Sequence, residues 1–429
     1  MTPPSATTPD LTFITLDPHD ETGRNGELLE GWGQAIPRGF HGPRMSATMR
    51  RTWLEHCRAD GVTIRGAWQP DAALGAGTIP VATYSSFDKS INSGLEQLPL
   101  RMITDVTVSP THRRRGLLRR MITEDLADAA ERGLPLAALT ATEGTIYGRF
   151  GFGIASRLAH VEVDTTARFA LRADAGDGVI ELVEPEEAWP AVQAVFARFH
   201  QQTRGSVERP QFYEATLTGR FHPETHESDP SLRAAVHLGA DGEPDGYVHY
   251  RISSVDGRRC ADVADLVAVH PTTYLRLWRL LADLDLVERV RWRRAPLVDP
   301  LPWSLVDPYV ARVTKVEDLL WLRVLDVVRA LEARPWGADG ETVLEVDDPL
   351  GYAAGRWRVS TVSGRAAVAA TTDPPDLRLT ADTLASLHLG GTTAANLAAA
   401  GRLDGEATAV TRFAAMADAG PTPYCITGF

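Results

Sequence analysis

The segment VTVSPTHRRRGLLRRM, residues 106–121, places the strongest constraint on how this chain of 429 residues folds. A run rich in β-branched residues starts near Arg101 and ends at Pro110, which predicts a strand that leads into a loop. Apolar residues then recur at spacings of three and four between Gly116 and Gly133, which predicts an amphipathic helix. The sequence therefore predicts a contiguous strand, basic loop and helix.

The same pattern returns in VADLVAVHPTTYLRLWRLL, residues 263–281, where a strand-like run again meets a proline, Pro271, and then an apolar-faced helix. A repeat of this length indicates a duplicated domain rather than a solenoid. The second copy has TYLRL in place of HRRRG, so we expect it not to bind the ligand of the first loop.

Strand-like and helical segments alternate along the rest of the chain. Strand-like runs occupy 11–16, 62–68 and 79–87, and helical spacing extends from Glu30 to Cys57. A third unit follows the proline-rich segment 293–308 and contains further strands and helices. The expected fold class is α+β, that is, mixed α/β.

The composition and net charge limit which cellular compartment and which partners we expect for this chain. A formal net charge of −12 provides no global attraction for a phosphate backbone, so we expect no nucleic-acid partner, whereas cationic amines would be attracted. The three cysteines lie far apart and form no metal or disulfide framework, which favours the cytoplasm. The sequence has no basic and apolar leader and no run approaching 18 apolar residues, so we expect no membrane partner.

The basic loop has the chemistry of a diphosphate site. A helix N-terminus presents unpaired backbone N–H groups, Gly116 lets an anion approach closely, and arginines add charge-assisted hydrogen bonds. A solvated basic face is the alternative for these arginines. The chain has no phosphate loop with a Walker lysine, so nucleoside triphosphate hydrolysis is not favoured.

The stretch Arg113 to Leu118 resembles the pyrophosphate loop of the GNAT superfamily of N-acetyltransferases, although Leu118 stands where many relatives keep a small residue. The resemblance implies that acetyl-CoA is bound as the acetyl donor. It assigns the diphosphate to Arg114, Arg115, Gly116, Leu117, Leu118 and Arg119. It assigns the pantetheine arm to Val106, Thr107 and Val108, and the thiol end to Thr142 and Glu143. In HPETHE, Pro223 disfavours a helical metal pair of His222 and His226, so we expect no metal.

The block TEGTIYGRFGFG, residues 142–153, supplies a candidate acid. A departing thiolate needs a proton, and a phenol with an ordinary pKa of about 10 is protonated at neutral pH. Tyr147 fits this role, and the GNAT acid tyrosine occupies the same position in YxxxGF. Alternatively, Tyr147 is a structural residue of the core whose aromatic ring packs the strand against the helix.

Nearly the whole chain resembles the Eis (enhanced intracellular survival) family of bacterial acetyltransferases. The resemblance rests on the segments VTVSPTHRRRGLLR and TEGTIYGRFGFG and on the degenerate second copy. It also rests on two segments similar to sterol-carrier domains, DLRLTADTLASLHLGG and AAAGRLDGEA. It implies tandem GNAT-like domains at 1–160 and 161–310 and a sterol-carrier-protein-like domain at 311–429. It also implies a homo-oligomer, commonly a hexamer.

The family resemblance further implies that the chain terminus enters the active site of the first domain. The α-carboxylate of Phe429 would then be the general base. A carboxyl group with a pKa of about 3.5 is a weak base in water, so this role requires desolvation or a relaying water. A frayed or packing tail is the alternative for CITGF, residues 425–429.

These features predict an acetyl-CoA-dependent N-acetyltransferase that moves an acetyl group to a primary amine of a small cationic acceptor by direct transfer in a ternary complex. An aminoglycoside-like antibiotic, a polyamine and a lysine amine all remain open as acceptors. The alternative is a non-catalytic CoA-sensing or lipid-carrier binding protein, in which the sterol-carrier-like unit holds an apolar ligand.

Overall fold

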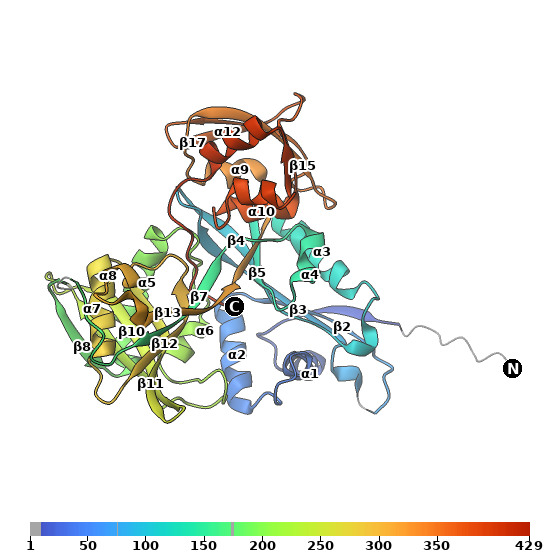
Figure 1. Cartoon of the computed structure of the whole chain (residues 1–429). Helices are drawn as coiled ribbons and strands as arrows, with labels where there is room; N and C mark the ends of the chain where they lie inside the picture. Colours follow the sequence, from blue (N-terminus) through green and yellow to red (C-terminus); the bar gives the residue numbers. More distant parts are fainter. Residues whose placement is uncertain (1–9, 75, 173–175) are drawn as a thin grey trace.

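Three β-sheets divide the protein into three lobes. The computed structural model describes residues 10–74, 76–172 and 176–429. In Figure 1 the first lobe is blue to teal, the second is green to yellow, and the third is orange to red. The C-terminus lies near the centre of the molecule, where the lobes approach one another (Figure 1).

The first sheet has seven strands in the order β1-β2-β3-β4-β5-β14-β6. Only β4 and β5 pair in parallel, and the predicted basic loop and helix form the crossover between them. The strands are β1 (Thr12–Leu16), β2 (Thr63–Trp68), β3 (Ala82–Asn92), β4 (Gln97–Val108), β5 (Leu136–Thr140), β14 (Leu320–Val324) and β6 (Gly153–Ile154).

Helix α3 (Leu117–Glu131) covers one face of this sheet because its apolar stripe matches the helical repeat. Met121, Ile122 and Leu126 of α3 are buried in one cluster with Ile103 of β4 and Leu139 of β5. The predicted strand and helix are thus both present, and their packing fixes the basic loop at one edge of the β4 and β5 pair.

The second sheet repeats this topology in the order β13-β7-β12-β11-β10-β9-β8. Strand β11, helix α7 and strand β12 correspond to β4, α3 and β5, and β11 and β12 are again parallel. The elements are β7 (Arg157–Asp164), β8 (Val179–Val183), α5 (Pro185–Gln202), α6 (Phe212–Leu217), β9 (Arg233–Leu238), β10 (Pro244–Val255), β11 (Arg258–Ala268), α7 (Pro271–Ala282), β12 (Arg289–Pro296), α8 (Leu301–Ser304) and β13 (Ala311–Asp318).

The third sheet has five strands in the order β17-β16-β15-β18-β19, with four helices. Its elements are α9 (Val327–Glu332), β15 (Gly340–Asp347), β16 (Gly355–Val362), β17 (Arg365–Ala370), β18 (Leu377–Thr380), α10 (Ala381–His388), α11 (Ala394–Ala399), β19 (Leu403–Gly405) and α12 (Ala407–Ala417).

The predicted domain division assigns residues 311–324 to the third domain, but the structure places them in the first and second sheets. Strand β13 is an edge strand of the second sheet, and β14 lies between β5 and β6 in the first. All five residues of β14 are buried, so this apolar segment fills a central position of the first sheet.

The predicted helical stretch from Glu30 to Cys57 is two helices, α1 (Gly23–Gly39) and α2 (Ala47–Ala59). The interruption has a local cause, since His41 adopts a positive φ of 61° and Gly42 and Pro43 follow it. The prediction of one continuous helix is therefore wrong between residues 40 and 46.

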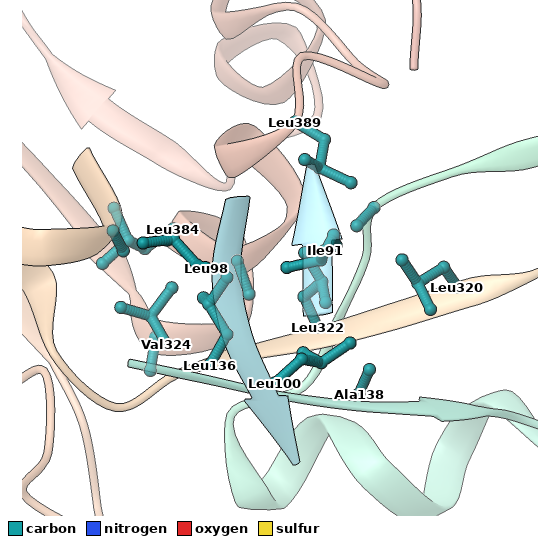
Figure 2. Close-up of a cluster of buried hydrophobic side chains, with 14 of the residues drawn as sticks. Ile91, Leu98, Leu100, Leu136, Ala138, Leu320, Leu322, Val324, Leu384 and Leu389 are labelled. Atoms are coloured by element: carbon teal, nitrogen blue, oxygen red, sulfur yellow. The ribbon is translucent and has the colours of Figure 1, made fainter. Parts of the chain in front are cut away.

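The first and third lobes share one hydrophobic core. Figure 2 shows Leu98 and Leu100 of β4 clustered with Leu136 of β5, Leu322 of β14 and Leu384 of α10. Each of these side chains is at most 3% exposed. Because interiors pack at crystal-like density, this shared core holds the third lobe in a defined position beside the first sheet.

Helices long and apolar enough to cross a lipid bilayer are absent from the part of the chain that the structure describes.

Candidate active site

An opening between β4 and β5 forms the centre of the site. The two strands pair from Leu100 and Leu136 to Ile103 and Leu139, and pairing stops there. Strand β4 continues to Val108, beyond the last paired residue. Backbone groups on the facing edges of the two strands are therefore available to a ligand beyond this point.

A β-bulge in β4 lies where the strands separate. Thr83 pairs with Thr107 and Ser85 with Thr104, so Tyr84 alone faces Asp105 and Val106. Asp105 has a positive φ of 53°, which aspartate tolerates better than most residues. The Ser85 hydroxyl donates to the Asp105 carboxylate at 3.0 Å, and the Thr83 hydroxyl donates to the Asp105 carbonyl at 2.6 Å.

The basic loop starts α3 without a side-chain cap. Arg114 and Gly116 both adopt positive φ values, 62° and 76°, and Gly116 is the N-cap residue. Because glycine offers no capping side chain, the N–H groups of the first turn remain available to an anion. A β-carbon on Gly116 would meet nothing within 4 Å, so its backbone conformation, rather than crowding, favours glycine there.

A cleft of about 790 Å³ extends from this loop to the opening between the strands. The structure brings all of the predicted cosubstrate residues and Tyr147 together in its wall. The predicted lining residues are Val106, Thr107, Val108, Arg114, Arg115, Gly116, Leu117, Leu118, Arg119, Thr142, Glu143 and Tyr147.

The charge of this wall is strongly positive although the chain is acidic. Five arginines and one carboxylate, Glu143, line the cleft. One of the arginines, Arg149, was not singled out from the sequence. Arg120 lies outside the cleft, pairs with Glu124 at 2.8 Å, and places its guanidinium 3.8 Å from the ring centre of Phe13. The arginine run is thus part cleft wall and part surface.

Tyr147 ends the short helix α4 (Gly144–Tyr147) and is 7% exposed. Its ring meets Phe152 edge-on, with ring centres 6.2 Å apart. Burial, together with the nearby charge of Glu143, raises the pKa of Tyr147 to about 12. The phenol is therefore fully protonated at neutral pH, while its side chain both packs in the core and lines the cleft.

The chain terminus lies at the opening between β4 and β5. Thr140, the last residue of β5, donates its hydroxyl to a terminal oxygen of Phe429 at 2.7 Å. Residues 425–427 are at most 1% exposed, so the tail is not frayed. The tail is thus a packed segment whose last residue lies at the opening between the strands.

A second, smaller cavity of about 170 Å³ adjoins the terminus. Its wall is mostly apolar, with several aromatic side chains, and Asp105 is the one acidic side chain in the described wall. The lining residues are Met49, Thr52, Trp53, His56, Phe87, Thr104, Asp105, Pro210, Phe212, Phe221, Gly428 and Phe429. Strand β4 therefore borders both cavities, with Thr104 and Asp105 in the small one and Val106 to Val108 in the large one.

Sequence reasoning missed Asp105 as a residue of the site and gave Thr140 no hydrogen-bonding role. Asp105 stood inside an apparently regular strand, and a bulge leaves no reliable mark in a single sequence. Its only signal was an acidic residue among β-branched neighbours. Thr140 follows a run of buried residues and had no motif of its own.

Comparison with known protein families agrees with this geometry. Models of the acetyltransferase (GNAT) domain match residues 39–155 and 205–324, and a model of the sterol carrier protein domain matches residues 327–426. The N-acetyltransferase Eis of Mycobacterium tuberculosis is 38% identical over 373 residues, which cover 85% of this chain and 87% of the relative. The chain belongs to the Eis family of N-acetyltransferases.

Other relatives support the same assignment. An uncharacterized N-acetyltransferase of Streptomyces griseus is 38% identical over 358 residues, covering 80% of this chain and 86% of the relative. The crystal structure of Eis1 from Mycobacterium abscessus has a TM-score of 0.79 at 28% identity and covers 98% of this chain and 100% of that chain. The predicted fold, two GNAT domains followed by a sterol-carrier domain, is confirmed, and the protein is an acyltransferase.

Groups of three or more histidine, cysteine, aspartate or glutamate side chains that could hold a metal ion are not found among residues 10–74, 76–172 and 176–429.

Proposed function

We propose that this Eis-family enzyme transfers an acetyl group from acetyl-CoA directly to a primary amine of a small cationic acceptor, within a ternary complex. The observation that carries the proposal is that strand β4 borders both cavities, with Val106 to Val108 in the large cleft and Thr104 and Asp105 in the small cavity. Tyr147 lines the large cleft, and Phe429, which Thr140 binds, lines the small cavity.

The large cleft fits the chemistry of acetyl-CoA, whose thioester supplies the electrophilic carbonyl carbon. Arg114, Arg115 and Arg119 and the uncapped N-terminus of α3 would hold the diphosphate. The exposed edge of β4 from Val106 to Val108 offers backbone groups to the pantetheine amides, as an added strand does.

Tyr147 is the proposed general acid, which donates its phenolic proton to the departing sulfur. Its raised pKa keeps the proton in place until charge develops on that sulfur. The burial that raises the pKa of the phenol would also raise that of a thiol in the same cleft, so the two remain matched for proton transfer.

The Phe429 carboxylate is the proposed general base, which accepts a proton from the attacking amine directly or through water. The Thr140 hydroxyl fixes one carboxylate oxygen, and the aromatic side chain of Phe429 anchors the residue in the small cavity. This arrangement keeps a carboxylate partly desolvated, which strengthens it as a base.

The small cavity is the proposed acceptor site. Asp105 can pair with an ammonium group, while Trp53, Phe87, Phe212 and Phe221 offer apolar faces. Hydroxyl groups placed against these faces would lack hydrogen-bond partners, at a cost of about 1–3 kcal/mol each. This wall therefore favours an unbranched alkylamine, such as a polyamine or a lysine side chain, over an aminoglycoside ring.

We also propose that the chain is a homo-oligomer, a hexamer by family resemblance. The support within the chain is a run of exposed apolar side chains in residues 298–313 of the second lobe. Val298, Trp303, Val306, Tyr309 and Val313 are 67%, 85%, 56%, 79% and 60% exposed, respectively. Apolar exposure of this kind commonly marks a protein interface.

Replacement of the acid tests the proposal. We expect Tyr147→Phe to lower kcat about 100-fold or more, since general acid catalysis contributes about 10²–10⁴-fold, while the Kd for acetyl-CoA stays within about 2-fold. A thiol-release assay with polyamine, lysine and aminoglycoside acceptors, together with calorimetric titration of acetyl-CoA, measures both quantities. Full turnover by Tyr147→Phe would remove the acid assignment. Lack of turnover by the native enzyme on every amine would contradict the proposed acceptor class.

A further inference from the structure

The second lobe holds the chain terminus at the opening in the first sheet. Tyr424 donates its hydroxyl to the Arg294 carbonyl at 2.6 Å, and Thr427 donates to the Val207 carbonyl at 2.8 Å. Ile426 is 1% exposed and belongs to the hydrophobic core of the second lobe. Tyr424, Ile426 and Thr427 are therefore bound to the second lobe, whereas Cys425 between them is buried in the core that the first and third lobes share.

The tail extends between the points at which parallel pairing ends in the two GNAT sheets. In the first sheet, Thr140 follows the last parallel pair on β5 and binds Phe429. In the second sheet, the parallel pairing ends at Trp292 on β12, and Arg294 lies two residues further along. Arg294 donates from Nη1 to the Ile426 carbonyl at 2.8 Å.

The Tyr213 hydroxyl uses all of its hydrogen-bonding positions on Gly428 and Arg294. It accepts from the Gly428 backbone N–H at 2.8 Å and from Arg294 Nη1 at 3.2 Å. It also donates to the Gly428 carbonyl at 3.3 Å. A phenol has one donor and two acceptor positions, so Gly428 and Arg294 satisfy all of them.

Gly428 lies directly against the guanidinium of Arg294. A β-carbon at position 428 would be 3.0 Å from both Nη1 and Nη2. A larger residue there would have to displace the arginine. The peptide unit before Phe429 is therefore fixed by hydrogen bonds on one side and by close packing on the other.

We propose that Tyr213 and Arg294 are positioning residues that aim the Phe429 carboxylate at the acceptor amine. This inference rests on the proposed function, because it assumes that the carboxylate is the base. The second GNAT domain, which lacks the arginine loop, thereby contributes to catalysis in the first. A misplacement of about 1 Å at a reacting group can cost about 100-fold in rate, so loss of this clamp is expected to affect kcat strongly.

Three variants test the clamp: Tyr213→Phe removes the hydroxyl and keeps the ring, Arg294→Met removes the charge, and Arg294→Lys keeps the charge. Arg293→Met is the matched control, since Arg293 is the exposed neighbour on the same strand. We expect Tyr213→Phe and Arg294→Met to lower kcat at least about 10-fold. The KM for acetyl-CoA should stay within about 2-fold, and Arg294→Lys should recover part of the loss.

The pH profile distinguishes positioning from general loosening of the fold. The Arg294 guanidinium lies beside Gly428, and a nearby positive charge favours an ionised carboxylate. We expect the acidic limb of the kcat profile to move to higher pH in Arg294→Met and to stay in place in Arg294→Lys and Arg293→Met. Asp105 and His56, the other titratable side chains that line the pocket around Phe429, are unchanged in all of these variants.

Release of Phe429 by carboxypeptidase A gives a second readout, independent of activity. The native tail should resist digestion, and Tyr213→Phe and Arg294→Met should lose Phe429 at least about 10-fold faster than Arg293→Met. Thermal unfolding identifies any variant that has lost its global fold. A folded Arg294→Met with native kcat, native pH profile and native resistance to digestion would overturn the inference.

A chain extended by one glycine beyond Phe429 separates this inference from the proposed function. The extension moves the terminal charge by up to about 3.3–3.6 Å. If the extended chain keeps full activity, the carboxylate is not the base and the proposed function fails. If the extension abolishes turnover while the clamp variants behave like Arg293→Met, only the positioning inference fails.

Discussion

Individual residues in this site have structural and chemical roles at the same time. Tyr147 is a core side chain, and its burial also raises its pKa and keeps it protonated. Asp105 forms a β-bulge and also places a carboxylate in the small cavity. The packing around each residue therefore also sets the chemistry of its side chain. A conservative substitution, which keeps the packing and changes the chemical group, can separate the two roles.

Asp105→Asn tests the acceptor site at this scale. Asparagine also tolerates a positive φ, so the bulge should persist while the charge is lost. A hydrogen bond to a charged group contributes about 1.5–3 kcal/mol, which corresponds to about a 10- to 100-fold rise in the acceptor KM. Steady-state kinetics with a polyamine acceptor measures this change.

The KM for acetyl-CoA should not change in Asp105→Asn. Asp71→Asn, at an exposed position, is the control and should leave both constants at native values. An acceptor KM that is equal in the native enzyme and in Asp105→Asn would show that the acceptor ammonium binds elsewhere.

At the scale of elements, the two copies of the GNAT motif differ in the connection between strand and helix. Both strands that precede the helix carry a bulge, in β4 and in β11. In the first copy the loop 109–116 separates β4 from α3, whereas only two residues, Val269 and His270, separate β11 from α7. The second copy therefore lacks both the arginines and the loop that would present helix N–H groups to an anion.

Gly116→Ala tests the loop, and Gly133→Ala is its matched control. The two glycines flank α3, have φ values of 76° and 75°, and would each place a β-carbon in open space. Each substitution should lower the free energy of unfolding by about 1–2 kcal/mol, because alanine is strained in the left-handed region. Urea denaturation measures this loss.

Only Gly116→Ala should also weaken acetyl-CoA binding, since Gly116 lines the cleft and starts the N–H array. We expect its Kd in calorimetric titration to rise about 5-fold or more. Equal affinities in the two variants would mean that the loop backbone does not hold the diphosphate.

At the scale of the whole molecule, three lobes combine to make one site. The first supplies the cleft and Tyr147, the third leads into the tail that ends at Phe429, and the second binds that tail through Arg294. Figure 1 shows the C-terminus at the centre of this arrangement. A shared core between the first and third lobes keeps the arrangement fixed.

Self-association is the prediction at this scale. We expect light scattering coupled to size-exclusion chromatography to give a mass of about six chains for the native protein, and a smaller assembly for Trp303→Asp. The charge would be placed at an exposed apolar position of the proposed interface, where burial without a partner is costly. Leu74→Asp, at a fully exposed position in the first lobe, should leave the mass unchanged. A native monomer would contradict the proposal.

Much of the fold could be predicted from the sequence because its patterns are local. The strand before Pro110, the helix after Gly116 and the second copy at Pro271 all follow from periodicity and from turn residues. The interruption between α1 and α2 and the placement of β13 and β14 were not predicted. The interruption depends on a single positive φ, and the placement of β13 and β14 depends on which sheet each strand joins.

By itself, the sequence determined the repeated strand and helix motif and the basic loop, because these features depend on neighbours along the chain. The resemblance to a known family assigned the residues that line the cleft. The tertiary structure alone decided that Thr140 meets Phe429, 289 positions away, and that Tyr213 and Arg294 hold the peptide before it. Contacts between such distant positions depend on how three separately patterned cores pack together. Helical and strand periodicities carry no information about that packing.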